Sequence, residues 1–431
     1  MIDPTEAGWL AKYLEIRREL PFDERVAKID NPEYKYYAHL HNSGLLYGHP
    51  IKLPLELELD MLQWPVKERM KVIFAEAFYS ACLIFKPAST GNTAEDFGGI
   101  LSGFYSVYRP ELLKASLFAL KKAKTDAVRA EQALDRRIKV KSQWNATFWR
   151  GFFHNILLFV DIIHFIEYLL NGPESLKARL QDDDRRIRMQ ALRLIALASN
   201  ADGASNKNEQ QLFDYFLESA ELPKEQNQKA KALTQAGLKL NNFVPNPDAS
   251  WLERKYFLEL AILTLWADRK ITAAEETFLH KLAAMLQLDE EEVDRSVLSV
   301  QSFVMNNWER IHYLQEKQNF FILRKHLTER MSKIAKKYAR QIGQEISESK
   351  ELMDLFKLSS ERELTTSEKD QIRQQLFDIL KSVPAFVILM LPFSFLTIPV
   401  LIKIIPKNAF PDSFDPNRLN VKKRGNRTID L

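Results

Sequence analysis

The stretch that decides the architecture runs from Ser382 to Ile402 and reads SVPAFVILMLPFSFLTIPVLI. It contains no charged residue, and Lys403 follows it directly. A helix of this length spans about 30 Å, which matches the hydrocarbon thickness of a bilayer. No other part of the sequence combines this length with an absence of charge. The stretch therefore predicts a C-terminal membrane segment.

Prolines mark this segment at Pro384, Pro392 and Pro399, and Pro406 follows it. A proline removes a backbone donor and kinks or breaks a helix. Three forms remain open: a kinked spanning helix, a re-entrant insertion with both ends on one side, and a proline-broken hairpin buried in a soluble fold. Basic residues flank the segment on both sides, so their distribution does not decide between these forms.

The composition predicts an all-α, multi-domain protein. Of 431 residues, 27% are charged and only 13 are glycine, and long stretches lack the turn clusters that separate strands. We expect an N-terminal helical domain, a tandem helical repeat, connecting helices, the proline-kinked membrane segment and a basic tail, at residues 1–172, 173–300, 301–360, 361–416 and 417–431.

Other features limit the class of function. The N-terminus has no basic region followed by an apolar core, so we expect no export signal and a mainly cytoplasmic chain. The single cysteine, Cys82, lies in an apolar run and is expected to be a buried, inert thiol. A net charge of +4 is too small to predict DNA binding. No nucleophile–base set is visible, so we expect a protein that is not an enzyme.

The region before residue 300 contains an internal repeat. LRLIALASNAD aligns with LELAILTLWAD, which pairs Asp202 with Asp268 and, further on, Glu209 with Glu275. The unit resembles the TerB-like fold of tellurite-resistance proteins, which implies a helical repeat whose turn acids bind a divalent metal. Arg269 stands where glycine is usual in that family. Helix capping by the same acids is the alternative interpretation.

A second, weaker metal candidate lies in the apolar run WRGFFHNILLFVDIIHFIEYLL. Asp161, His164 and Glu167 follow one another at three-residue intervals and share one side of a helix. An amphipathic core helix and a membrane-surface helix are the alternatives. His39, His41 and His49 could suggest another site, but no cysteine or acidic residue near them in sequence completes a ligand set.

A strongly basic run precedes the membrane segment. Residues 324–340 contain seven lysines and arginines against one acid, Glu329. The run could lie on anionic lipid, touch ribosomal RNA, pair with the acidic run at 345–370, or form a solvated face.

The passage from Leu364 to Phe414 resembles the LETM-like family (leucine zipper–EF-hand transmembrane proteins), of the bacterial biofilm-associated type. The resemblance rests on the capping box of Thr365 and Glu368, on the sequence Leu-Lys-x-Val-Pro, on the spaced prolines, and on the closing Phe-Pro-x-x-Phe. Mitochondrial members are inner-membrane proteins tied to cation/proton exchange and to ribosomes.

Two departures qualify what the resemblance implies. Mitochondrial members carry an acid inside the apolar segment, where this chain has Phe395, so we expect no transport by this segment alone. We also expect the family's ribosome-binding domain and EF-hand, which follow the membrane segment, to be missing.

Together these observations predict a non-enzymatic protein at the bacterial inner membrane, acting in ion homeostasis, envelope physiology or biofilm formation. The alternatives are a ribosome-binding membrane-associated protein and a metal-responsive TerB-like scaffold. The predicted partners are membrane lipid and either the ribosome or other proteins, without DNA. No cofactor is expected apart from a divalent metal at the repeat.

Overall fold

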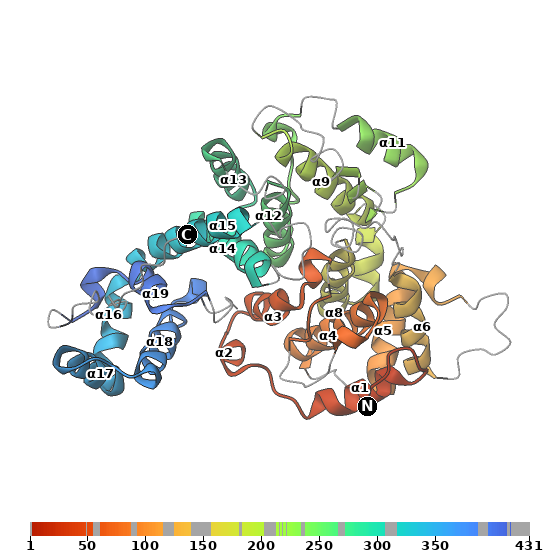
Figure 1. The fold of residues 1–431 in the computed structure, drawn as a ribbon. Coiled ribbons are helices and arrows are strands. Elements are labelled where there is room, and N and C mark those ends of the chain that lie inside the picture. The colour runs from red at the N-terminus through yellow and green to blue at the C-terminus, as the bar shows by residue number, and fades with distance from the viewer. Residues whose placement is uncertain are drawn as a thin grey trace, which may run out of the picture. The chain divides into compact units, whose positions relative to one another are not determined.

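The structure, a computed structural model, describes most of the chain, and its described residues form helices and connections without a strand (Figure 1). This confirms the predicted all-α class. The described residues are 2–48, 50–54, 61–87, 93–114, 125–138, 157–180, 183–201, 213–214, 216–217, 219–220, 222–233, 238–265, 272–306, 317–386, 395–411 and 414.

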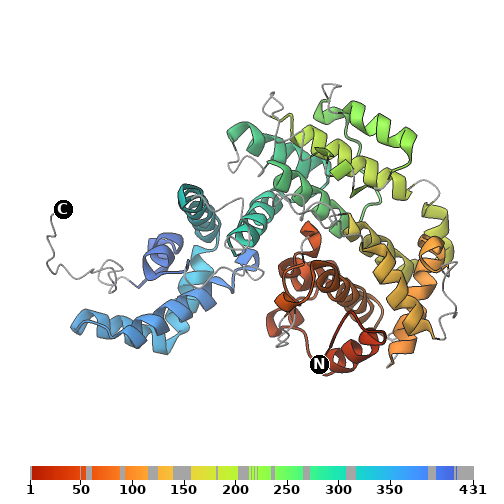
Figure 2. The same cartoon turned by 45° about the vertical axis from the view of Figure 1, so that its right-hand side comes forward.

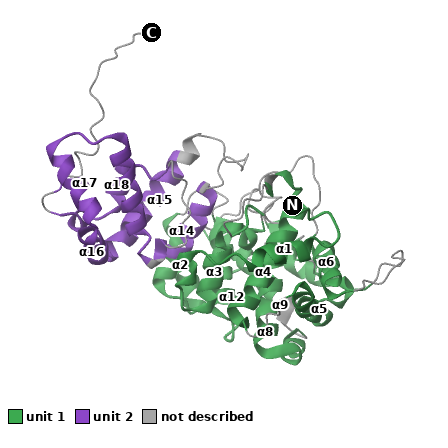
Figure 3. Cartoon of the chain, turned by 90° about the horizontal axis from the view of Figure 1, so that it is seen from below, with its two compact units in different colours: residues 1–293 green, residues 294–431 purple. Residues whose placement is uncertain are grey.

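The chain forms two compact units, residues 1–293 and 294–431, coloured separately in Figure 3. The division falls inside helix α14 (Glu290–Asn306). The predicted boundary at residue 172 lies within the first unit. It coincides with a kink in helix α8 (Leu158–Leu180), where Gly172 has φ 82° and Pro173 follows.

Besides α8, unit 1 (residues 1–293) contains ten complete described α-helices and five short 3₁₀ helices. The α-helices other than α8 are α1 (Trp9–Arg18), α2 (Glu24–Ala27), α3 (Pro32–Leu40), α4 (Val66–Phe85), α5 (Ala94–Tyr108), α6 (Asp126–Arg137), α9 (Asp183–Ala198), α11 (Lys224–Leu233), α12 (Trp251–Leu265) and α13 (Ala273–Met285). The 3₁₀ helices are η1 (His41–Ser43), η2 (Leu45–Tyr47), η3 (Met61–Gln63), η5 (Pro110–Leu112) and η6 (Leu240–Asn242).

Helix α4 lies at the centre of unit 1. Every residue from Met70 to Cys82 is buried, and the helix packs against α3, α6 and α8. A helix that is buried on all sides is typical of a position inside a larger core. It ends at Phe85, and Lys86 leaves the helical conformation (φ −147°, ψ 59°), since the residue before a proline such as Pro87 disfavours that conformation. Cys82 is buried, as expected, and burial raises the pKa of its thiol to about 12.

Carboxylates from distant parts of the chain cap several helices of this unit. Glu131 accepts hydrogen bonds from the backbone N–H groups of Gly8 (3.0 Å) and Leu10 (2.9 Å) at the start of α1. Glu95 does the same for α6 at Asp126 (2.8 Å) and Ala127 (3.3 Å). The negative charge complements the positive end of each helix dipole, so these contacts fix where helices meet.

The internal repeat corresponds to a repeat of helices. Helices α9 and α12 carry its two aligned copies and pack side by side (Figure 2). Helices α11 and α14 begin at Lys224 and Glu290, which are equivalent positions of the repeat. Phe213 and Phe216 of the first copy and Leu279 and Leu282 of the second are buried.

Unit 2 (residues 294–431) is built from the end of α14 and five further described α-helices, with two 3₁₀ helices. These elements are α15 (Lys317–Lys337), α16 (Ala339–Glu348), α17 (Lys350–Glu361), α18 (Thr366–Leu380), η10 (Pro384–Phe386), α19 (Ile398–Ile404) and η11 (Lys407–Ala409). Helix α19 packs against α15 and α18, and η11 packs against α16.

Candidate functional site

Helix α18 opens the candidate site, and its start follows from local sequence. The Thr365 hydroxyl accepts from the Glu368 backbone N–H (3.3 Å), and the Glu368 carboxylate accepts from the Thr365 backbone N–H (2.8 Å). This confirms the predicted capping box. Arg362 donates two further hydrogen bonds to Glu368, at 3.0 and 2.6 Å. The hydrogen bond with Arg362 is the main reason that the pKa of Glu368 is lowered to about 2.

The apolar stretch after α18 is not one continuous helix. It begins with the 3₁₀ turn at Pro384 and ends with the short helix α19. Thr397 is extended (φ −75°, ψ 153°), and Pro399 occupies the first turn of α19, where its missing N–H costs no hydrogen bond. Pro392 lies outside the described residues. In the part of the chain that the structure describes, no helix is both long and apolar enough to cross a membrane.

The described ends of this stretch are packed inside unit 2. Val383, Phe386, Phe395, Leu401 and Ile404 are all at most 2% exposed. Of the predicted membrane prolines, Pro399 is exposed and Pro406 is buried. An apolar run that fills the space between amphipathic helices has the same composition as a membrane helix. Burial of both described ends is what the third form considered for the segment predicts for those residues.

Phe395 contacts the basic helix α15. The Arg324 guanidinium lies over the Phe395 ring, 5.7 Å from its centroid, and Arg324 Nη2 donates to Thr397 Oγ1 at 3.5 Å. A cation over an aromatic face is attracted by the ring quadrupole. The ring at position 395 therefore receives an arginine from α15.

The closing Phe-Pro-x-x-Phe forms an aromatic cluster with α17. The rings of Phe356 and Phe414 are stacked with centroids 3.7 Å apart, and Phe410 lies 5.5 Å from Phe414. All three side chains are buried. The cluster ties the end of the stretch to the helix that precedes α18, because each ring removes a large apolar area from water.

Helix α15 is amphipathic and basic. Its buried side carries Leu323, Leu327, Met331 and Ile334, while Lys325, Lys333, Lys336 and Lys337 are exposed. Two cations of this helix reach back to α14: Asp294 accepts from Arg330 (2.5 Å) and lies 3.5 Å from Lys333. The remaining positive charge faces solvent beside the apolar stretch.

Asp161, His164 and Glu167, the weaker metal candidate, are not arranged as a set of metal ligands. Asp161 receives two hydrogen bonds from Arg137, at 2.6 and 2.8 Å, and one from Tyr108 (3.2 Å). Glu167 pairs with Arg179 at 2.7 Å. His164 is buried against the Tyr108 ring, with centroids 5.0 Å apart. Each carboxylate is thus neutralised by an arginine.

Of the four acids that the sequence nominated as metal ligands in the internal repeat, the structure describes one, Glu275. Asp202, Glu209 and Asp268 lie outside the described residues. Glu275 is buried and forms a capping box with Thr272 at the start of α13, with Thr272 N–H donating to its carboxylate at 2.5 Å. Its observed contacts therefore match the capping interpretation. Among the described residues, no three His, Cys, Asp or Glu side chains are grouped so that they could hold a metal.

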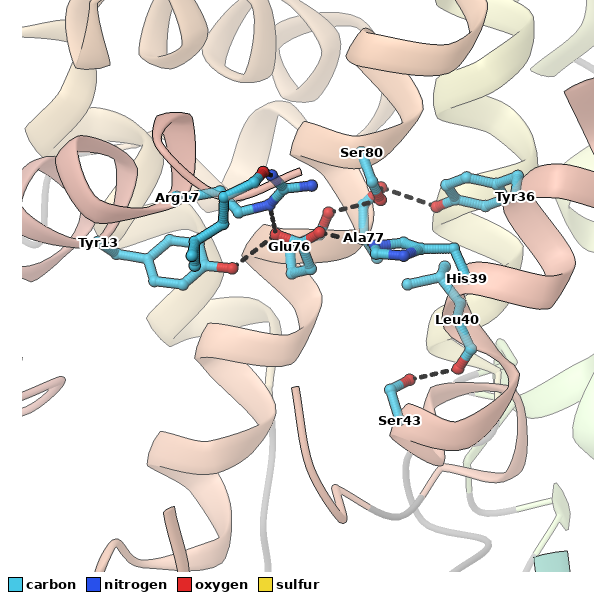
Figure 4. A network of polar contacts seen from close by, with 10 residues as sticks. Tyr13, Arg17, Tyr36, His39, Leu40, Ser43, Glu76, Ala77 and Ser80 are labelled. Atoms are coloured by element: carbon cyan, nitrogen blue, oxygen red, sulfur yellow. Dashed lines mark hydrogen bonds and ion pairs between the residues drawn. The ribbon is translucent and has the colours of Figure 1, made fainter. Parts of the chain in front are cut away.

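Unit 1 contains a buried ionic network around Glu76, which the sequence analysis missed (Figure 4). The Glu76 carboxylate accepts from Tyr13 (2.6 Å) and Arg17 Nε (2.8 Å) and pairs with His39 Nε2 (2.8 Å). Burial raises the pKa of Glu76, but hydrogen bonds and charges from His39 and Arg17 outweigh it and hold the pKa below 4.5. Tyr36 donates to the Ala77 carbonyl in the same place.

A second network surrounds Glu259 on α12. Its carboxylate accepts from Tyr37 and from Tyr47 (2.9 Å), and Lys255 lies between Glu259 (3.3 Å) and Glu292 (2.5 Å). Burial raises the pKa of Glu259 despite the charge of Lys255. Helix α3 thus supplies His39 to one network and Tyr37 to the other, and joins α4 to α12.

Comparison with known proteins bears on unit 2. Residues 364–429 match the LETM1-like ribosome-binding domain. The match supports the LETM-like resemblance and covers a minor part of the chain. It includes α18, α19 and the aromatic cluster residues Phe410 and Phe414. No curated protein and no solved structure shows a significant match.

The match corrects one expectation. We expected the ribosome-binding domain to be missing, and this is wrong, because the passage interpreted as the membrane segment is itself the part that matches. The comparisons do not extend to the TerB-like repeat or to a biofilm-associated type.

Proposed function

We propose that this protein associates with ribosomes through unit 2 and acts by binding, without catalysing a reaction. The observation that carries the proposal is the match of residues 364–429 to the LETM1-like ribosome-binding domain. The described part of this passage is folded: its helices are capped, its apolar side chains are buried, and its closing phenylalanines are packed. A rigid module of this kind presents a defined surface to a large partner.

Attachment to the bacterial inner membrane remains a prediction from the family resemblance, as do roles in ion homeostasis, envelope physiology and biofilm formation. The apolar stretch motivates these predictions, and the burial of its described ends offers a second use for the same residues. Metal binding at the repeat likewise remains a prediction.

Co-sedimentation of the full-length chain with purified ribosomes tests the proposal. We expect saturable binding that weakens as salt rises, because phosphate contacts release counterions. Lysine-directed cross-linking of the pelleted complex should then identify Lys369, Lys381, Lys403 or Lys407 within the matched passage. Liposomes of neutral and anionic lipid, sedimented in parallel, measure membrane association independently.

Two results would contradict the proposal. One is the absence of saturable binding to ribosomes at low salt. The other is a complex whose cross-links lie in unit 1 alone, since the matched passage would then have no part in the contact.

A further inference from the structure

We infer that ribosomal RNA is contacted by a composite cationic ridge, formed by Lys336 and Arg340 from the α15–α16 junction and by Lys403 and Lys407 from α19 and η11. This inference rests on the proposed function and goes beyond it. It assigns part of the contact to residues before the matched passage, and it names the phosphate backbone of structured RNA as the partner.

The first observation concerns the surroundings of these four side chains. All four are exposed to solvent, and none forms an ion pair with another described residue. Some other cations of the unit are engaged: Arg330 pairs with Asp294, and Arg362 pairs with Glu368. Glu329 is the one acid in residues 324–340 and lies 3.9 Å from Lys325. Mutual repulsion of unpaired cations favours an anionic partner.

The second observation is that two segments far apart in sequence run beside each other. Arg324 of α15 contacts Phe395 and Thr397, just before α19 begins. At the other end, a Cβ atom at Gly343 of α16 would lie 3.3 Å from Cα of Ala409 in η11. The chain from 397 to 409 therefore follows α15 and α16 in the same direction.

This course determines where the cations lie along the ridge. Lys403 is halfway between the two contacts and comes level with the last turns of α15, where Lys336 is exposed. Gly343 and Arg340 are three residues apart, so they are neighbours along one side of α16. Lys407 lies two residues before Ala409, and we therefore place it beside Arg340. Each sequence segment contributes two cations to the inferred ridge.

The partner that fits is RNA rather than a lipid surface. Helices that bind membrane surfaces present large apolar side chains beside their basic ones. The exposed large apolar residues described in unit 2 are Phe321 and Ile322, at the opposite end of α15 from Lys336. Lysine and arginine without exposed apolar neighbours are instead typical of contacts with phosphate groups.

The test compares two full-length variants that lose the same charge. The ridge variant replaces its four cations by glutamine (K336Q, R340Q, K403Q and K407Q). The control variant replaces four lysines that are also exposed and have no ion pair among the described residues, and it carries K224Q, K281Q, K350Q and K357Q. Circular dichroism and hydrogen exchange verify that both remain folded. Ribosome affinity is measured over a series of salt concentrations.

If the ridge contacts phosphate, its variant binds at least about tenfold more weakly, and the slope of log K against log salt falls by about 3, or somewhat less than one per contact. The control variant should keep the slope of the unmodified protein. Equal slopes in both variants and in the unmodified protein would overturn the inference and leave the proposed function intact.

Two other outcomes separate the alternatives. If the unmodified protein does not bind ribosomes at all, the proposed function is wrong, and the ridge has no RNA partner. If the ridge variant keeps its ribosome affinity but loses binding to vesicles containing anionic lipid, the ridge is a membrane-surface contact and the inference is also overturned.

Discussion

The two units bury their side chains in different ways. In the interior of unit 1, Glu76, Asp161 and Glu259 are each at most 1% exposed and are held by arginine, lysine, histidine or tyrosine. Unit 2 is packed from aliphatic residues and from the rings of Phe356, Phe410 and Phe414. Its one buried carboxylate among the described residues is that of Asp294.

This difference has a physical consequence. A buried charge is tolerated only while its partners are present and correctly protonated, so the stability of unit 1 depends on charge balance. Apolar packing depends on area and shape and responds little to pH. The units should therefore respond differently to conditions and mutations that act on charge. Hydrogen exchange read by mass spectrometry assigns each response to one unit.

The largest difference is expected at alkaline pH. Burial raises the pKa of Tyr13, Tyr36, Tyr47 and Tyr105 well above the ordinary value of 10.0. The unfolded chain then releases these protons near pH 10 while the folded unit keeps them. The contribution of these phenols to the free energy of unfolding is therefore fully present below pH 10. Above pH 10 the free energy of unfolding falls by about 1.4 kcal/mol per pH unit for each such phenol.

Unit 1 should accordingly unfold above pH 10 before unit 2, whose described tyrosine, Tyr338, is partly exposed. Near-ultraviolet absorbance of phenolate, recorded together with hydrogen exchange, checks this order. Gradual ionisation of all tyrosines near pH 10, with unit 1 still protected from exchange, would show that these phenols are not buried.

The next largest effect is expected from Glu76→Ala. The substitution leaves Arg17, 2% exposed, without its carboxylate, and loss of one partner of a buried pair costs about 3–5 kcal/mol. Denaturant unfolding of the full chain should show an early transition, with exchange rising in unit 1 alone. Glu76→Gln keeps an acceptor for Tyr13 and should cost less.

Glu24→Ala is the matched control, because Glu24 forms an exposed pair with Lys28. We expect its unfolding transition to coincide with that of the unmodified protein. Equal stability of Glu76→Ala and Glu24→Ala would show that the network contributes nothing to unit 1.

The same difference explains what could be predicted from the sequence. The capping box of Thr365 and Glu368 was predictable because both residues lie within one turn. The Glu76 network was missed because Tyr13 and Arg17 lie 63 and 59 residues away, and His39 lies 37 residues away. One signal was present: Glu76 is a single acid in the apolar run VIFAEAFYSACLIF, and such an acid must find a partner.

The apolar stretch shows a different limit. Hydropathy measures whether residues avoid water, and this property is shared by membrane helices and buried core segments. The prolines carried more information, since Pro399 starts a new helix after the extended residue Thr397. The basic run at residues 324–340 was visible in the sequence. The packing of its helix, α15, against α19 is a tertiary contact that local patterns do not encode.

A smaller effect is expected where α5 meets α6. A Cβ atom at Gly98 would lie 2.4 Å from the backbone nitrogen of Ala127, so Gly98→Ala must push the two helices apart, at a cost of about 1–3 kcal/mol. At Gly99 the nearest atom is Asp126 Oδ2, at 3.6 Å, which is ordinary contact. Gly99→Ala should be neutral or stabilise the helix by up to about 1 kcal/mol.

These adjacent substitutions show whether unit 1 also depends on close backbone packing. Thermal unfolding of both variants tests this dependence. We expect Gly98→Ala to unfold at a lower temperature than Gly99→Ala. If Gly98→Ala is as stable as Gly99→Ala, the close approach of α5 and α6 is absent in solution.

The smallest effect is expected from Thr365→Ala in unit 2. The Thr365 hydroxyl accepts from the Glu368 N–H, and losing a side-chain cap costs about 1 kcal/mol. Thr366, the first residue of α18, is exposed and supplies no cap, so Thr366→Ala is the control. We expect faster exchange at the first amides of α18 in Thr365→Ala alone, without a pH dependence near pH 10. Faster exchange throughout unit 1, or an increase in exchange at alkaline pH, would contradict the difference between a charge-dependent interior in unit 1 and an apolar interior in unit 2.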